Sequence, residues 1–400
     1  MLLVEIGLRF YLNESASIEP VECKREDPIV HHGYKPITTC RYKTAEWDTE
    51  IRINSHGLRN KEIEESKNKF RVLVMGDSFT AAESVDYEKT FVYLAESTLI
   101  KEGKNIEVIN AGVPSYSPIL EYLWLREYGL ELNPDLVILN FDLGDVSGDN
   151  FMMDYYSGFE KSYDDNSSLE NKESGLDSKE VSDEKSPLIV KEEPIKLWAD
   201  TRRKLFISRA ENPDSLTLIT RIKFWLHTHF KSYGFFAEAT KKTIRKIRGI
   251  PEKPIYVLGD VKNDFEYVTR SIENAINREV YKSSLENLKR IKSLLDNNSI
   301  PFVVVYFPHG HQISGDEWAK GRQFYGLEQG KVYPLDSINV LMELSKEAEI
   351  ETYDATESFL KASDSLFPLF YPFDGHFTAN GNMVMSGVLA EIIRKKRNAS

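Results

Sequence analysis

The stretch VLVMGDSFT, Val72 to Thr80, decides the fold that this sequence predicts. It closes a largely apolar run that begins at Phe70 and stops at Gly-Asp-Ser. A short apolar run bounded by turn-forming residues is typical of a strand buried on both faces of a parallel sheet. The tripeptide has two interpretations: a turn that presents Ser78 as a nucleophile, or a strand stop followed by a helix cap.

Similar apolar runs recur along the chain and alternate with helical patterns. The further predicted strands are Ile106 to Ile109, Leu136 to Phe141, Pro301 to Phe307 and about Ile350 to Tyr353. The predicted helices are Tyr87 to Glu102, Ile119 to Leu130, Tyr281 to Leu295 and about Thr378 to Lys395. Strands that alternate with helices indicate an α/β protein with a doubly wound parallel sheet.

Composition limits the classes of function. The chain has 400 residues, of which 41% are hydrophobic, which is enough for one sizeable core with additions. Its formal net charge is -12. Surfaces that follow nucleic-acid phosphates need a clustered excess of Lys and Arg, so we expect no nucleic-acid partner.

The predicted core occupies residues 69–150 and 281–396, preceded by an irregular N-terminal wrap, residues 1–68, with a strand or two. The first residues, MLLVEIGLRF, are interrupted by Glu5 and Arg9 and are too short to span a bilayer, which takes about 20 apolar residues. Two alternatives remain for them: an ordinary amphipathic helix, or the end of an anchor whose beginning is outside this sequence.

Residues 151–280 interrupt the sheet pattern and form a predicted insertion. Within it, residues 161–196 are dense in charged and polar residues and predict a flexible loop, since they bury too little to offset the entropy of ordering. Residues 214–248 are helical in pattern, aromatic and basic. They fit a helical cap on the core, or a helix that faces a membrane surface or substrate.

The chain has two cysteines, Cys23 and Cys40, both before the first strong strand. Neither has the neighbours of a zinc site. A disulfide is expected if the protein is exported, and two free thiols if it is not.

Polar residues follow each predicted strand. In an open parallel sheet, ligands bind outside the carboxyl ends of the strands, so these residues are the candidates for function. They are Asp77 and Ser78 after the first strand, Asn110 and Gly112 after the second, Asp142 and Asp145 after the third, and His309 and His311 after the fourth.

A serine nucleophile needs a general base within hydrogen-bond reach and a carboxylate that orients this base. His376 and Asp374, just before the last helix, can supply both, although Asp-Gly-His also fits a turn with a helix cap. Backbone N–H groups of Ser78 and Gly112 are available as donors for an oxyanion hole.

Three blocks in this order resemble the SGNH hydrolases, also called the GDSL esterase and lipase family. They are GDSFT at 76–80, NAGVPSYSP at 110–118 and DGHFTANGN at 374–382. INSHGLRNKEI at 53–63, NPDLVILNFDLGD at 133–145 and the N-terminal LLVEIGLRF are similar to the membrane-associated bacterial branch. The resemblance implies a flavodoxin-like three-layer α/β/α sandwich with a parallel five-stranded sheet, and a triad of Ser78, His376 and Asp374.

One departure from the family pattern concerns the oxyanion hole. The family's third block supplies an asparagine donor, whereas an ungapped placement puts Asp145 at that position. An ionised carboxylate there would repel the oxyanion, unless burial keeps it protonated and donating. Alternatively, Asp145 is turned outward, Asn150 or Asn110 fills the role, or the enzyme is impaired.

Asp77, His309 and His311 are predicted to line the substrate cleft, with satisfied loop histidines as the alternative for the last two. Two histidines without a third ligand are not enough for a metal site, and no metal or other cofactor is expected. The sequence therefore predicts a serine ester hydrolase that removes small, acetyl-type acyl groups from a carbohydrate or lipid through an acyl-enzyme. The alternatives are an O-acyltransferase to polysaccharide and a non-catalytic carbohydrate-binding protein. We expect an exported or periplasmic protein, membrane-anchored through an incomplete N-terminal helix, with a cytoplasmic location as the alternative.

Overall fold

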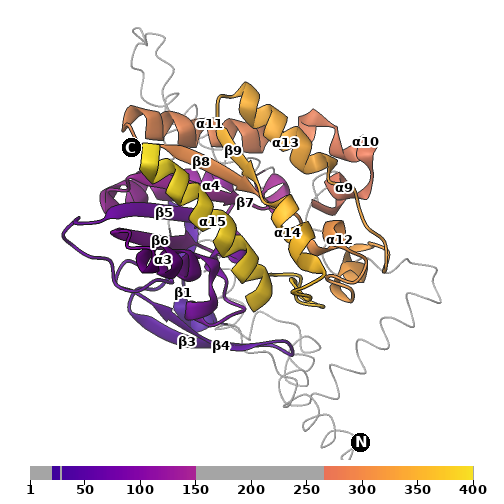
Figure 1. Ribbon diagram of the computed structural model, residues 1–400, viewed down its shortest axis with the longest axis horizontal. Coiled ribbons are helices and arrows are strands. Elements are labelled where there is room, and N and C mark those ends of the chain that lie inside the picture. Colours follow the sequence, from indigo (N-terminus) through magenta and orange to yellow (C-terminus); the bar gives the residue numbers. More distant parts are fainter. Residues whose placement is uncertain (1–19, 28, 150–264, 400) are drawn as a thin grey trace, which may run out of the picture. The chain divides into compact units, whose positions relative to one another are not determined.

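Five parallel strands form the central sheet in the order β6-β5-β7-β8-β9 (Figure 1). Their bounds are Phe70–Gly76 for β5, Ile106–Gly112 for β6, Leu136–Phe141 for β7, Phe302–Tyr306 for β8 and Glu351–Asp354 for β9. The computed structural model describes residues 20–27, 29–149 and 265–399, which all belong to one compact unit. Relabelled in chain order, the strands run 2-1-3-4-5, the flavodoxin-like order, so the predicted fold class is confirmed.

The interior strand β5 ends at the Gly-Asp-Ser turn. Val72 of β5 is in register with Val108 of β6 and Leu136 of β7, so β5 is paired on both sides. The next strand in sequence lies on one side and the third on the other, which makes the carboxyl end of β5 the topological switch point. Ligands bind at this place in open α/β sheets.

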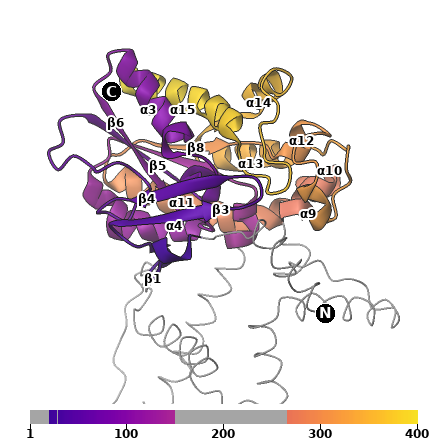
Figure 2. The ribbon, with the colours of Figure 1, turned by 90° about the horizontal axis from the view of Figure 1, so that it is seen from below.

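Helices cover both faces of the sheet, as Figure 2 shows. The helices α3, α14 and α15 lie on one face, and α4 and α11 pack together on the other. Their bounds are Phe91–Lys101 for α3, Pro118–Trp124 for α4, Lys282–Asn297 for α11, Thr356–Ser363 for α14 and Ala379–Ala399 for α15. The core on the first face includes Val72, Val108 and Ile138 from the sheet, with Leu389 and Ile393 from α15.

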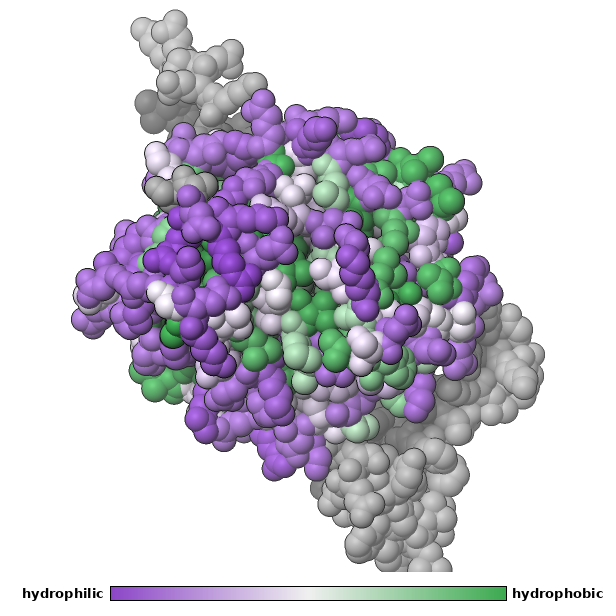
Figure 3. Space-filling view, in the orientation of Figure 1, coloured by the Kyte–Doolittle hydropathy of each residue, from purple (hydrophilic) through white to green (hydrophobic). Residues whose placement is uncertain are grey.

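The remaining helices and turns connect these layers. The further helices are α2 (Ser78–Ala81), α9 (Phe265–Arg270), α10 (Ile272–Ala275), α12 (Gly310–Ile313) and α13 (Asp336–Glu347). Single turns are η1 (Val21–Cys23), η2 (Tyr87–Lys89), η3 (Leu125–Gly129), η4 (Leu130–Leu132), η7 (Arg278–Tyr281) and η8 (Gly321–Tyr325). Figure 3 shows a mostly hydrophilic face, with hydrophobic residues gathered toward the side where α10 and α13 lie. Among the described residues no helix is long and apolar enough to cross a bilayer.

The N-terminal wrap consists of two antiparallel hairpins. Their strands are β1 (Lys24–Asp27) with β2 (His31–Tyr34), and β3 (Thr38–Lys43) with β4 (Asp48–Ile53). Cys23 and Cys40 form a disulfide with a Cα–Cα distance of 6.0 Å. Of the two alternatives left by the sequence, the structure has the disulfide, which joins the start of the first hairpin to the second.

Several predictions concern residues outside this description. They are the N-terminal helix, the flexible loop at 161–196 and the helical cap at 214–248. The end of the predicted insertion is described: α10 packs against α13, as does α9. The helices α13 and α14 were not predicted from the sequence.

Arg59 ties the N-terminal wrap to the turn that follows Ser78. Its side chain is fully buried, and Nη1 donates to the carbonyl oxygen of Ala81 at 2.9 Å and also to that of Ala82. Nη2 donates to the carbonyl oxygen of Val85 at 2.6 Å. The carbonyls of Ala81 and Ala82 end the short helix α2, and that of Val85 lies in the turn after it, so the guanidinium supplies donors that the helix backbone cannot.

We predict that Arg59→Met lowers the free energy of unfolding by about 3 kcal/mol or more, because three buried carbonyls lose their donor at about 1–3 kcal/mol each. Chemical denaturation measures the change. The control is Arg52→Met, since Arg52 is 79% exposed and should change stability by less than about 0.5 kcal/mol. Equal stability of the Arg59 and Arg52 variants would contradict this role.

Candidate active site

Ser78 lies at the switch point, in the turn Gly76-Asp77-Ser78. The first position of this turn requires glycine. Gly76 has φ +150°, and a Cβ atom there would come within 2.2 Å of Thr80 Oγ1. Asp77 caps α2 by accepting the Phe79 N–H at 2.8 Å, and its other oxygen accepts the Ser78 hydroxyl at 3.2 Å. Gly-Asp-Ser is therefore a helix cap that also presents the serine hydroxyl, and the role of Ser78 as a nucleophile stays a prediction.

His376 and Asp374 meet Ser78 as the sequence predicted. His376 Nε2 lies 2.7 Å from Ser78 Oγ, and His376 Nδ1 is hydrogen-bonded to Asp374 Oδ1. The imidazole thus bridges the hydroxyl and the carboxylate. This is the arrangement in which a serine can lose its proton to a histidine that a carboxylate orients.

Side chains that the sequence analysis missed hold the Asp374–His376 loop. Glu46, in the turn between β3 and β4, accepts the backbone N–H groups of Phe373 and Asp374, both at 2.9 Å. The Trp318 indole N–H donates to the Phe373 carbonyl at 3.0 Å. Gly375 has φ +89°, and a Cβ atom there would lie 2.7 Å from the Trp318 indole nitrogen. The loop is therefore fixed from two sides.

The charges around Ser78 change the pKa values of the site. Burial alone would lower the pKa of His376, but the Asp374 carboxylate, and beyond it Asp77 and Asp142, outweigh burial and raise the pKa to about 9. Burial and the Asp142 charge raise the pKa of Asp77 to about 7. Burial also opposes ionisation of Asp374, yet its histidine partner keeps the pKa of this carboxyl below the ordinary value.

The predicted oxyanion donors differ in availability. The backbone N–H of Ser78 has no protein acceptor among the described residues, whereas the Gly112 N–H donates to Asn110 Oδ1 at 2.9 Å. Asn110 also donates from Nδ2 to the Thr80 carbonyl at 2.9 Å, so its amide is engaged on both sides. Asn150, the other alternative donor, lies outside the described residues. Ser78 is the open backbone donor.

Asp145 belongs to a group of three buried carboxyls that also contains Asp77 and Asp142. Single oxygens of Asp77, Asp142 and Asp145 lie within 4.8 Å of one another. Asp145 Oδ2 accepts the Asp142 N–H at 3.0 Å, so the side chain points inward. Burial, followed by the charges of Glu121 and these neighbours, raises the pKa of Asp145 well above its ordinary value. A protonated Asp145 can donate a hydrogen bond, which an ionised one cannot.

The same three carboxyls have the spacing of a cation site. Each one already accepts a hydrogen bond: Asp77 from Phe79, Asp142 from Gly144 and Asp145 from Asp142. These bonds explain their positions without a metal ion. The expectation that the protein needs no metal or other cofactor stays a prediction.

The two histidines after β8 occupy different surroundings. His309 Nε2 is hydrogen-bonded to Asp142 Oδ1, and its ring lies 5.5 Å from that of Phe79, next to the serine. His311 is fully buried, and its Nε2 lies 3.0 Å from Thr269 Oγ1. The prediction that His311 lines a cleft is therefore wrong, because the residue faces the packed interior between α12 and α9. His309 is also buried, and it contacts the site through Asp142 and Phe79.

Comparisons with known proteins find solved structures only at low sequence identity and low TM-score. No family model matches the chain, and no curated protein matches it. The acetyl xylan esterase AlAXEase is 13% identical with a TM-score of 0.36, over 81% of this chain and 99% of that chain. The esterase EstA from Pseudoalteromonas sp. is 10% identical with a TM-score of 0.37, over 82% and 99%.

A GDSL-like lipase from Bacteroides thetaiotaomicron is 11% identical with a TM-score of 0.37, over 84% of this chain and 93% of that chain. Because identities and scores are low, the class is defined by the fold and site themselves: an α/β protein with a Ser-His-Asp arrangement at the carboxyl edge of a parallel sheet.

We predict that kcat/KM for an aryl acetate rises with pH through about 9, where His376 loses its proton and becomes a base. Asp77→Asn should move this rise to lower pH, since it removes a negative charge that stabilises the imidazolium and still caps α2. A pH–rate profile measures both. Glu88→Gln, an exposed charge, is the control and should leave the midpoint in place. An unchanged profile for Asp77→Asn would contradict the charge coupling.

We also predict that Asp145→Asn keeps kcat/KM within about tenfold of wild type, whereas Asp145→Leu lowers it by about 10²–10³. Asparagine donates a hydrogen bond and still accepts the Asp142 N–H, but leucine does neither. Steady-state hydrolysis of an aryl acetate, with circular dichroism to confirm folding, makes the comparison. If the folded Asn and Leu variants are equally slow, Asp145 does not act as a neutral donor.

Proposed function

We propose that this chain is a serine ester hydrolase. The observation that carries the proposal is the continuous hydrogen-bonded row of Ser78 Oγ, the His376 imidazole and the Asp374 carboxylate. The three side chains come from two distant segments and meet at the switch point of the sheet. A binding protein on the same fold has no need for this alignment, so the geometry favours the enzyme over the non-catalytic alternative.

In the proposed reaction, Ser78 Oγ attacks the ester carbonyl carbon while its proton passes to His376 Nε2. Asp374 stabilises the imidazolium that forms. The Ser78 N–H, with protonated Asp145, stabilises the charge on the carbonyl oxygen. The tetrahedral intermediate expels the alcohol, which takes the proton from His376, and leaves an acyl-serine. Water then attacks this ester by the same route and releases the carboxylic acid.

The substrate is proposed to be a small acyl ester, of the acetyl type, on a carbohydrate or lipid; this part extends the motif resemblance. If a sugar hydroxyl replaces water in the second step, the same residues carry out acyl transfer. We also propose an exported or periplasmic location, which the Cys23–Cys40 disulfide supports because disulfides persist in oxidising compartments. Membrane association through the N-terminus is part of this proposal and rests on the sequence resemblance.

Turnover of a short-chain aryl acetate tests the enzyme. Wild type should hydrolyse it, whereas Ser78→Ala and His376→Ala should lose about 10³-fold or more in kcat, because the nucleophile and base act as one unit. A fluorophosphonate probe should label wild type at Ser78 and leave Ser78→Ala unlabelled. The matched control is Ser115→Ala, a serine that follows β6 and lies outside the triad. Equal turnover by wild type and Ser78→Ala would refute the proposal.

A further inference from the structure

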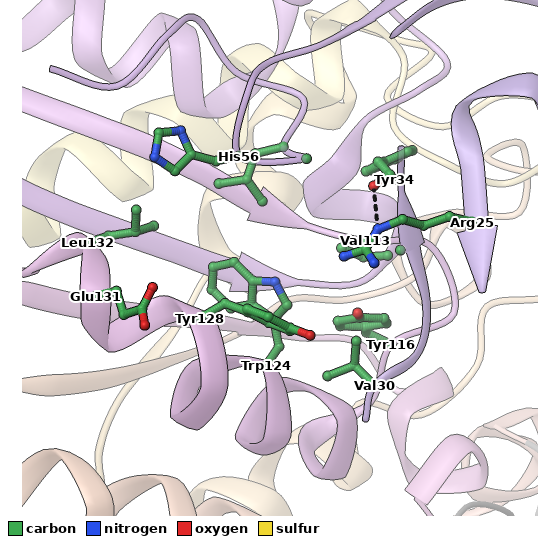
Figure 4. Close-up of a pocket in the computed structure, with 13 residues that line it drawn as sticks. Arg25, Val30, Tyr34, His56, Val113, Tyr116, Trp124, Tyr128, Glu131 and Leu132 are labelled. Carbon is green, nitrogen blue, oxygen red and sulfur yellow. Dashed lines mark hydrogen bonds between the residues drawn. The ribbon is translucent and has the colours of Figure 1, made fainter. Parts of the chain in front are cut away.

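A cavity of about 240 Å³ lies between the first hairpin and the helical run that begins with α4. Neither Ser78 nor His376 lines it. The hairpin, the turn after β4 and the turn after β6 contribute one part of the wall, and α4 with its continuation contributes the other. The lining side chains used below are Arg25, Tyr34, His56, Tyr116, Trp124, Tyr128 and Glu131 (Figure 4).

Four aromatic rings give the cavity firm, flat surfaces. Tyr34, Tyr116 and Trp124 are between 2% and 8% exposed, so their positions are fixed by packing. The hydroxyl of Tyr34 donates to Glu83 at 2.7 Å, that of Tyr116 to the His32 carbonyl at 2.7 Å, and that of Tyr128 to Asp27 at 3.2 Å. Tyr128 is half-exposed, and because its hydroxyl is engaged, it offers mainly apolar ring surface to a ligand.

Polar groups accompany these rings. Figure 4 shows His56 and Glu131 on one side of Trp124 and Tyr128, with Arg25 on the other. Within the part of the chain that the structure describes, the Trp124 indole N–H and the Glu131 carboxylate have no hydrogen-bond partner. The cavity therefore combines flat apolar surface with a donor and an acceptor available at its edge.

The charges of the lining select against an anionic ligand. The Arg25 guanidinium is 3.0 Å from Asp27, and its Nε donates to the Tyr34 carbonyl at 3.1 Å, so its charge is balanced by the protein. The Glu131 carboxylate is exposed and carries an unbalanced negative charge. A phosphate or a carboxylate ligand would be repelled by Glu131 without gaining a free cation.

We propose that this cavity binds a neutral sugar ring of a glycan, at a site apart from the triad. A pyranose ring has a C–H face that packs on aromatic rings, and hydroxyls around its edge that pair with groups such as the Trp124 N–H and the Glu131 carboxylate. The cavity is slightly smaller than the range of about 300–1,000 Å³ typical of drug-sized ligands, which suits a single ring. The site would hold the glycan on the protein independently of the chemistry at Ser78.

Ligand-detected NMR with the full-length Ser78→Ala chain tests this proposal without turnover. The probes are the methyl glycosides of glucose, xylose and N-acetylglucosamine, with the methyl glycoside of glucuronic acid as the anionic comparison. At least one neutral glycoside should bind, and more tightly than the glucuronide. Tyr128→Ala should weaken that binding about tenfold, consistent with loss of a stacked ring. Glu131→Gln, an exposed change that preserves the fold, should weaken it severalfold.

Tyr122→Ala is the matched control, because Tyr122 of α4 is half-exposed, as is Tyr128 of η3, but does not line the cavity. It should bind as Ser78→Ala alone does. Absence of binding by all neutral glycosides, or equal losses in the Tyr122 and Tyr128 variants with no effect of Glu131→Gln, overturns the proposal.

Aryl acetate hydrolysis by wild type is measured separately. Hydrolysis without glycoside binding overturns the sugar site alone, and binding without hydrolysis overturns the hydrolase alone.

Discussion

The hydrogen bond of 2.7 Å between Ser78 Oγ and His376 Nε2 joins residues that are 298 positions apart in the chain. It can form only if the loop before α15 passes over the carboxyl end of the interior strand β5. The strand order, with β6 and β7 on either side of β5, leaves that end open. Arg59 fixes the turn after Ser78, and Glu46 and Trp318 fix the loop of His376. The fold thus brings both halves of the site to one point.

The electrostatics of the site depend on the same convergence. Asp77, Asp142 and Asp145 end or follow neighbouring strands, so a parallel sheet necessarily brings them close together. Burial, together with repulsion from neighbouring carboxylates, raises the pKa values of Asp77 and Asp145. The negative charges of Asp77 and Asp142 also stabilise the imidazolium of His376. A hydrogen bond donated by Asp145, as in the proposed mechanism, is compatible with this environment, because burial and the neighbouring charges favour its protonated form.

Local pattern predicted much of this structure. All five strands of the central sheet were predicted, because short apolar runs of valine, isoleucine and leucine leave few alternatives to a buried strand. The meeting of Ser78 with His376 followed from the rule that functional residues gather at strand ends.

The helix Asp336–Glu347 was missed although its apolar residues recur with a helical period, and the shorter Thr356–Ser363 offered a weaker pattern. Arg59 and Glu46 could not be predicted, because arginine and glutamate are normally exposed and their partners are backbone groups of distant turns. The prediction for His311 was wrong because it relied on the position of this residue after a strand, whereas the side chain is buried against Thr269.

The central claim is that Ser78 becomes acylated during turnover. Wild-type protein is mixed with an aryl acetate, quenched in acid within the first turnovers, and examined by peptide-mapping mass spectrometry. The account predicts one acetyl group on the peptide that carries Ser78, formed no later than the first release of the aryl alcohol and absent from Ser78→Ala. Hydrolysis that proceeds with Ser78 unmodified, or an acetyl group that appears on a different residue and persists in Ser78→Ala, would contradict it.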